Sequence, residues 1–377
     1  MLFSEVIGQK ELIGKIVTLV NQHHLPHAMM IAGNEGNGAM SVALATAQFI
    51  LCTDKKENDA CGVCAACTKM NKLQHPDVHF SFPTFKKDAN KIPVSNDFIR
   101  EFRTFILENP YGIDTQWLQH IGTEKQGNIT ATECREIIQK LQLRSFESEY
   151  KIMIMWYPEY LDKEGNILLK LIEEPTEKTL LFFVTGNVNA ILPTIQSRTQ
   201  LFPLKRLSDV EIKEALVKKG INDQSATQYA RIAEGNFQYA LTLLSTSEND
   251  LVNNLRDWLN AIYANKGIEL LNWVNNIAAK PKEQQKKFLE YVIQLLEHLI
   301  RFKHLGADKI ALLESEIKMI QVLIDKGMDG FQINAITNIL NDSIYEIERN
   351  ANGKIIFHSL SLRIQKIVLR AKEVAKV

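Results

Sequence analysis

The sequence lacks a long hydrophobic run, an excess of one charge and a low-complexity tract. Its longest wholly apolar stretches, such as Leu180 to Val184, are far shorter than the ~20 residues that cross a bilayer, so we expect no membrane partner. The 44 basic and 44 acidic residues cancel, so any contact with nucleic acid must come from a local patch. Charged residues also interrupt the first twenty positions, unlike a signal peptide, and we expect a cytoplasmic protein.

Cysteine is scarce, and four of the five cysteines fall close together. These four, which define an expected metal module at about 52–67, are Cys52, Cys61, Cys64 and Cys67. Closely spaced C-x2-C turns supply thiolates at the corners of a tetrahedron, which predicts a structural zinc ion with no open coordination position. Two disulfides are the alternative, although a reducing compartment disfavours them. The fifth cysteine, Cys134, is expected to be a small buried hydrophobic residue.

Three short apolar runs predict buried strands, with helical patterns between them. The strands are expected at 25–33, 151–155 and 180–185, and the helices at 37–51, 132–143 and 165–174. Such alternation is typical of a parallel sheet covered by helices on both faces. The composition, with 45% hydrophobic residues among 377, suits a folded chain of two to three domains. We expect an α/β domain at 1–203, a small helical domain at 204–246 and an all-helical domain at 247–377.

Residues of about 79–127 fit this alternation badly. They carry several aromatic residues, including Phe80, Phe82 and Trp117, together with many charges. We interpret the segment as an insertion whose aromatic side chains pack onto the α/β domain, with binding of a partner as the alternative.

The first expected strand leads into an incomplete phosphate-binding loop. Gly33, Gly36 and Gly38 keep the glycine framework of G-x-x-x-x-G-K-[ST], between a strand and a helix. Ala39 stands where the motif has the lysine that neutralises phosphates, and Met40 where it has the hydroxyl that holds Mg²⁺. The pattern therefore predicts that the loop keeps its backbone shape and loses its nucleotide chemistry.

The second expected strand supports the same interpretation. A nucleotide hydrolase places acidic residues at the end of this strand, but Trp156 and Tyr157 occupy those positions here. Glu159 is the nearest carboxylate, and we expect it at the surface. Two losses in one site predict that the chain neither binds Mg-ATP well nor hydrolyses it, so we expect no functional ATP site.

Several motifs together resemble one family. They are FSEVIGQ at 3–9, LPHA at 25–28, NILLKLIEEP at 166–175 and LPTIQSRT at 192–199. In this order, and with the cysteine module, they resemble the clamp loaders of the AAA+ family over nearly the whole chain. The resemblance implies a P-loop NTPase-like α/β domain, a helical lid domain and an all-α collar domain that joins a circular assembly.

The resemblance also implies a role and partners. The partners would be other clamp-loader subunits, of gamma/tau and delta type, and through the complex the sliding clamp and primed DNA of the DNA polymerase III holoenzyme. Arg198, beside Ser197, would be an arginine finger offered to the ATP of a neighbouring subunit, although Thr199 departs from the usual cysteine. We thus expect a non-hydrolysing, stator-like subunit; the alternative is an active ATPase motor subunit.

Overall fold

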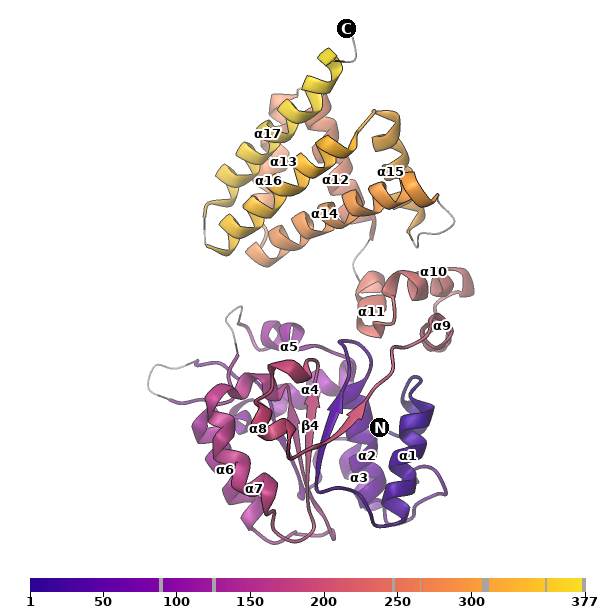
Figure 1. Cartoon of the computed structure of the whole chain (residues 1–377), viewed down its shortest axis with the longest axis vertical. Helices are drawn as coiled ribbons and strands as arrows, with labels where there is room; N and C mark the ends of the chain where they lie inside the picture. Colours follow the sequence, from indigo (N-terminus) through magenta and orange to yellow (C-terminus); the bar gives the residue numbers. More distant parts are fainter. Residues whose placement is uncertain are drawn as a thin grey trace. The chain divides into compact units, whose positions relative to one another are not determined.

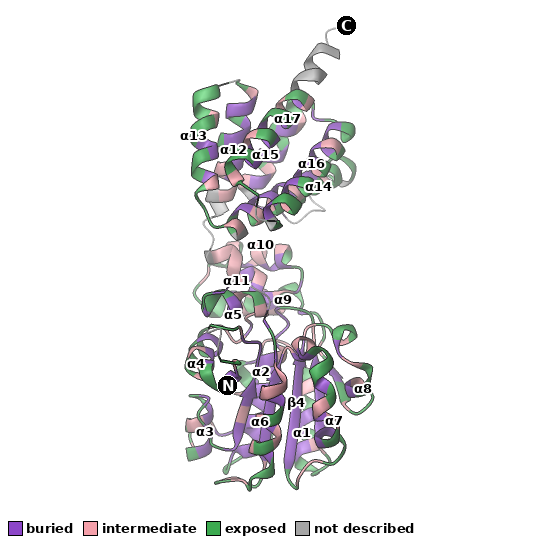
Figure 2. Cartoon of the chain, turned by 90° about the vertical axis from the view of Figure 1, so that its left-hand side faces the viewer, coloured by how far each residue is buried: buried purple, intermediate pink, exposed green. Residues whose placement is uncertain are grey.

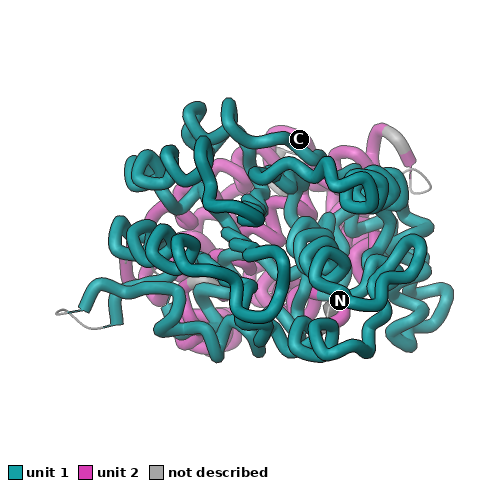
Figure 3. The backbone as a smooth tube through the Cα atoms, turned by 90° about the horizontal axis from the view of Figure 1, so that it is seen from below, with its two compact units in different colours: residues 1–241 teal, residues 242–377 magenta. Residues whose placement is uncertain are grey.

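The computed structural model describes residues 1–87, 91–123, 127–245, 248–264, 266–306, 312–349 and 351–374. The chain forms two compact units, Met1–Leu241 and Thr242–Val377, which Figure 3 shows in teal and magenta. The predicted boundary between 246 and 247 lies outside the described residues. The separation of residues 204–246 as a domain of their own stays a prediction.

A five-stranded parallel sheet organises the first unit (Figure 1). In chain order its strands are β1 (Ala28–Ala32), β2 (Val78–Ser81), β3 (Lys151–Trp156), β4 (Thr179–Thr185) and β5 (Gln200–Pro203). They lie in the order β2-β3-β4-β1-β5, and each neighbouring pair is parallel. The sheet confirms the predicted α/β class, and its three central strands are the three apolar runs.

Helices cover both faces of this sheet. In chain order the helices of the first unit, the last of which continues past Leu241, are η1 (Phe3–Glu5), α1 (Lys10–Asn21), α2 (Ala39–Leu51), α3 (Ala65–Met70), η2 (Ser95–Phe98), α4 (Ile99–Glu108), α5 (Asp114–His120), α6 (Ala131–Gln142), η3 (Pro158–Leu168), α7 (Leu169–Glu173), η4 (Val188–Ala190), α8 (Pro193–Gln196), α9 (Asp209–Lys218), α10 (Asp223–Ala233) and α11 (Phe237–Ser245).

Neighbouring residues of a central strand enter different cores because strand side chains alternate. Ile152 and Ile154 of β3 join a cluster with α1, α2 and α4, whereas Met153 and Met155 join a cluster with α6, α7 and α8. All residues of β1, β3 and β4 are buried, as Figure 2 shows in purple. Cys134 of α6 is fully buried in the second cluster, as predicted.

The predicted insertion at 79–127 is only partly an insertion. Its first residues belong to β2, which pairs with β3. The start of the predicted insertion is therefore part of the sheet. The aromatic residues do pack onto the domain. The Phe82 and Phe102 rings stack with centroids 3.9 Å apart, and the Trp117 indole lies edge-on to Phe82 and donates to the Pro83 carbonyl at 2.7 Å.

The described part of the second unit is helical, as predicted. Its helices are α12 (Glu248–Tyr263), α13 (Gly267–Ala278), α14 (Lys282–Leu305), α15 (Glu314–Asp325), α16 (Gly330–Glu348) and α17 (Gly353–Val374). Trp258 and Trp273 stack at 4.9 Å in its core, where the Trp258 indole donates to Ser361 Oγ at 2.8 Å. None of the helices in the described residues is long and apolar enough to span a membrane.

Candidate functional site

The glycine loop between β1 and α2 has the conformation that its sequence predicts. Gly36 and Gly38 adopt positive φ angles of 74° and 91°, which favour glycine. A Cβ atom at Gly38 would lie 2.6 Å from the Tyr111 ring, and one at Gly36 would lie 1.8 Å from Asn236 Oδ1. The strand-loop-helix context of the motif is thus confirmed, and other parts of the chain press directly against the loop.

Aromatic side chains fill the space next to the loop. The Tyr111 ring packs edge-on to Phe237 at 5.0 Å, and its hydroxyl accepts a hydrogen bond from the Ile7 N–H at 2.8 Å. Burial raises the pKa of Tyr111 to about 12, so the phenol stays neutral. With Trp156 and Tyr157 on the other side, these groups leave about 30 Å³ at the loop. On this measure one water molecule needs about 10–15 Å³, so the space holds no more than a few water molecules.

The charge near the loop is negative. Ala39 and Met40 supply no cation and no hydroxyl at the start of α2. The loop carries Glu35, whose pKa is raised by burial and by the nearby Asp114 carboxylate. Asp114 in turn accepts a hydrogen bond from the Tyr160 hydroxyl at 2.7 Å. Sequence reasoning missed both carboxylates because Asp114 is distant in sequence and Glu35 sits at a variable position of the motif.

Glu159 corrects the prediction of a surface residue. It is half-buried, and its Oε1 accepts hydrogen bonds from Thr185 Oγ1 at 2.5 Å and from the Gly186 and Asn187 N–H groups at 2.9 Å. Burial raises the pKa of this carboxyl. Tyr157, at φ 55°, reverses the chain after β3 and so turns Glu159 back to the end of β4. The carboxyl therefore fixes the loop that follows β4.

Arg198 follows the short helix α8, whose Ile195 belongs to the same core cluster as Met153 and Met155 of β3. Its Nε donates to Glu173 Oε1 at 2.5 Å, and its Nη1 donates to the Thr194 carbonyl at 3.0 Å and to Ser197 Oγ at 3.2 Å. The side chain is 35% exposed, so its guanidinium is reachable from outside the chain. The structure thus brings Arg198 and Ser197 together.

The support beneath Arg198 is rigid. Ile195 is fully buried, which anchors the short helix α8 in the core. Gln196 Nε2 donates to the carbonyls of Val188 at 2.9 Å and Ile191 at 2.7 Å, so α8 is tied to the loop after β4. Since Glu159 fixes the start of that loop, a continuous set of hydrogen bonds leads from β3 to the arginine.

The four clustered cysteines form a possible metal centre. The Sγ atoms of Cys52, Cys61, Cys64 and Cys67 all lie within 4.8 Å of one another. Two of the Sγ pairs, Cys52–Cys64 and Cys61–Cys67, are 3.9 Å apart. A tetrahedral zinc ion with Zn–S bonds of about 2.3 Å requires S···S separations of about 3.8 Å, whereas a disulfide requires about 2.05 Å. All five cysteines are free thiols, so this geometry fits a metal and does not fit disulfides.

Backbone groups also favour sulfur ligands at this centre. The Cys61 N–H donates to Cys52 Sγ at 3.3 Å, and the Cys64 N–H donates to Cys61 Sγ at 3.2 Å. Burial raises the pKa of the Cys52 thiol. Four thiolates so close together would repel one another, so holding all four sulfurs deprotonated here would require a cation between them.

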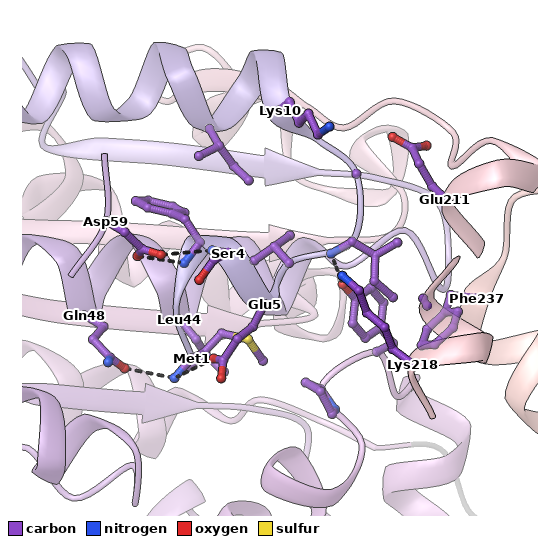
Figure 4. Close-up of a pocket in the computed structure, with 18 of the residues that line it drawn as sticks. Met1, Ser4, Glu5, Lys10, Leu44, Gln48, Asp59, Glu211, Lys218 and Phe237 are labelled. Carbon is purple, nitrogen blue, oxygen red and sulfur yellow. Dashed lines mark hydrogen bonds and ion pairs between the residues drawn. The ribbon is translucent and has the colours of Figure 1, made fainter. Parts of the chain in front are cut away.

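A cavity lined by described residues lies beside the loop and not on it (Figure 4). It measures about 1180 Å³, and Met1, Gln48 and Asp59 line one end while Lys218 and Phe237 line the other. Tyr111 separates it from the glycine loop, since that residue lines both spaces while residues 33–40 do not line the cavity. The cavity and the glycine loop thus lie on different sides of the Tyr111 side chain.

The sequence is similar to subunits of DNA polymerase III. The family model described as "DNA polymerase III, delta subunit" matches residues 8–208, which is just over half of the chain. The gamma/tau subunit of DNA polymerase III from Mycobacterium tuberculosis H37Rv is 24% identical over 217 residues, which cover 57% of this chain and 31% of that relative. The delta' subunit from Bacillus subtilis 168 is 22% identical over 214 residues, covering 56% and 52%.

The chain thus spans about a third of the length of the mycobacterial relatives that it matches. Among solved structures, a gamma subunit-related protein from Thermotoga maritima aligns over 95% of this chain and 99% of its own. Its sequence identity is 16% and its TM-score is 0.43.

Proposed function

The chain belongs to the AAA+ clamp-loader family of DNA polymerase III subunits, and we propose that it is a delta-prime type subunit that does not hydrolyse ATP. In this role it assembles with gamma/tau and delta type subunits and helps to load the sliding clamp on primed DNA. The observation that carries this proposal is the filled phosphate loop. A nucleotide needs several hundred Å³, while Tyr111, Trp156 and Tyr157 leave about 30 Å³.

Electrostatics supports the same proposal. Nucleotide-hydrolysing relatives of this fold use a lysine and Mg²⁺ to offset the charge of a triphosphate. At this loop a triphosphate would meet Glu35 and Asp114 with no compensating lysine at position 39. Bringing like charges together in a partly buried site is unfavourable. Both space and charge therefore oppose ATP at this loop.

The active part of the subunit is then Arg198, which acts on the ATP of a neighbouring subunit. An arginine supplied in trans stabilises the charge of the transferring phosphoryl group and accelerates hydrolysis by about 10³ to 10⁵. Arg198 suits this role because it is exposed on a rigid support, next to Ser197. The chain needs no ATP site of its own for this contribution.

The proposal is tested in the reconstituted clamp loader with Arg198→Ala and, as a matched control, Arg135→Ala, which removes an exposed arginine from α6. The quantity measured is the single-turnover phase of ATP hydrolysis that belongs to the site next to this chain. We expect Arg198→Ala to slow that phase at least about hundredfold and Arg135→Ala to leave it unchanged. Equal rates for the two variants would contradict the finger assignment.

An active motor subunit is the second candidate, because several relatives are gamma/tau subunits. It predicts magnesium-dependent ATP hydrolysis by the purified chain. We expect no hydrolysis above background, and no heat of binding when ATP is titrated into the protein. A measurable turnover that disappears in Tyr111→Trp, which adds bulk at the loop, would favour the motor.

For the cysteine cluster we propose structural zinc, held by Cys52, Cys61, Cys64 and Cys67. Metal analysis is expected to find about one zinc ion per chain. Cys61→Ser with Cys64→Ser should release it and unfold the module locally. Cys134→Ser is the matched control, since this buried thiol lies outside the cluster and its loss should leave the metal in place. A folded protein that contains no metal would refute this proposal.

A further inference from the structure

Arg198 is held by groups of its own chain on one side only. Nε contacts the Glu173 carboxylate, and Nη1 contacts the Thr194 carbonyl and Ser197 Oγ. Within the part of the chain that the structure describes, Nη2 makes no hydrogen bond. A guanidinium carries five N–H donors in a rigid plane. The contacts on Nε and Nη1 therefore restrain the plane and leave the Nη2 hydrogens without a partner among the described residues.

Glu173 has a rigid base of its own. It ends α7, where the preceding residue, Ile172, is buried in the same core cluster as Ile195 of α8. α7 and α8 contact each other directly, and Thr194 Oγ1 donates to Asn166 Oδ1 at 3.4 Å. The carboxylate and the arginine, 25 residues apart in sequence, are thus carried by two elements that pack against each other.

We propose that Glu173 is a positioning residue for Arg198, which aims the guanidinium at a phosphate bound by the neighbouring subunit. This inference rests on the proposed function above. A carboxylate that binds Nε restricts rotation of the long arginine side chain before the neighbour arrives, so less conformational entropy is lost when the phosphate is engaged. Glu173 also lowers the net positive charge near the guanidinium, but it contacts Nε and leaves Nη2 uncontacted.

A purely stabilising role does not account for this pair. The Arg198 side chain is 35% exposed and that of Glu173 is 47% exposed, and ion pairs of this exposure contribute little to folding stability. The next residue, Glu174, is also an exposed glutamate but makes no ion pair with Arg198 in the structure. The two glutamates therefore provide a matched test of position against charge.

The experiment uses the complete reconstituted clamp loader with sliding clamp and primed DNA. Single-turnover ATP hydrolysis is measured across ATP concentrations for Glu173→Ala, Glu173→Gln and Glu174→Ala, each with Arg198 or with Arg198→Ala. We expect Glu173→Ala to slow the phase of the adjacent site about three- to tenfold at saturating ATP, which is the usual cost of a small misplacement of a catalytic group. The ATP concentration at half-maximal rate should change less than about twofold.

Two controls separate positioning from charge and folding. Glu173→Gln keeps an oxygen that can accept from Nε, so it should retain at least about half of the rate. Glu174→Ala should match the unmodified complex, and Glu173→Ala should have no further effect once Arg198 is alanine.

The outcomes distinguish this inference from the proposed function. If Arg198→Ala itself leaves the phase unchanged, the finger proposal and this inference both fail. If Arg198→Ala slows the phase while Glu173→Ala does not, only the positioning role fails. A faster phase in Glu173→Ala, an equal loss in Glu174→Ala, or a loss that persists beside Arg198→Ala also overturns the positioning role.

Discussion

The glycine loop and the Arg198 segment are the two places to which the proposed function assigns a role, and their surroundings differ in opposite ways. At the loop, Tyr111 and its aromatic neighbours fill the space, and the nearby charges are negative. At the other end, Arg198 is exposed and positive, and its contacts are with Glu173 and its own short helix. The loop is thus packed like part of the core, whereas Arg198 lies partly in solvent, where another molecule can reach it.

The comparison predicts that the loop residues now matter for stability. Tyr111→Ala removes a buried ring from Gly38 and Phe237 and should lower the free energy of unfolding by about 2–4 kcal/mol. Tyr111→Phe loses only the contact with the Ile7 N–H and should cost about 0.5–1.5 kcal/mol. Urea denaturation of both variants checks this; an unchanged midpoint for Tyr111→Ala would mean that the ring is not part of the core.

A lysine at position 39 tests whether lack of space or lack of positive charge keeps ATP from the glycine loop. Ala39→Lys alone should not create ATP binding, because Tyr111 still occupies the space next to Gly38. Combined with Tyr111→Ala, the same substitution should tighten binding of ATP about tenfold relative to Tyr111→Ala alone, which corresponds to about 1.4 kcal/mol. Calorimetric titration of the three variants measures both effects, and binding by Ala39→Lys alone would show that the loop is open.

Glu159 connects the two ends, and its protonation gives a pH-dependent prediction. Burial raises the folded-state pKa above the unfolded value, so the stabilisation is complete below the unfolded pKa and is lost as pH rises through the folded pKa. Glu159→Gln should therefore reduce the loss of stability with rising pH. Urea midpoints between about pH 4 and pH 8 compare the two proteins, and parallel curves would contradict the assignment.

The smallest effect is expected at the exposed end. Arg198→Ala should change the free energy of unfolding by less than about 0.5 kcal/mol, because its ion pair with Glu173 is partly exposed. Thermal unfolding of the purified chain measures this. A large loss of stability would mean that Arg198 holds the fold together, and the contrast with Tyr111 would disappear.

Local patterns predicted the parts of the fold that are buried on both faces. β1, β3 and β4 form continuous apolar runs, and the glycines of the loop mark its turn. β2 and β5 were not predicted, because each has only four residues and β5 buries only Phe202. Edge strands of this length lack the apolar run that identifies a buried strand.

The site was predictable only where its parts lie close together in sequence. The cysteine cluster and the losses at Ala39 and Met40 follow from spacing alone. The place of Tyr111 over Gly38 does not, because 72 intervening residues separate them and tertiary packing alone joins them. The contact of Glu173 with Arg198 could not be predicted either. Both residues lie in motifs of the resemblance, but the motifs do not say that the two side chains meet.

Tyr111 fills the space beside the glycine loop with a group that belongs to the chain itself. The ring is covalently part of the polypeptide, so its contacts with Ile7 and Phe237 form during folding. Unlike the contacts of a bound nucleotide, they do not depend on the concentration of a free ligand. On the proposed function, this part of the subunit would keep one conformation whether or not neighbouring subunits hold ATP.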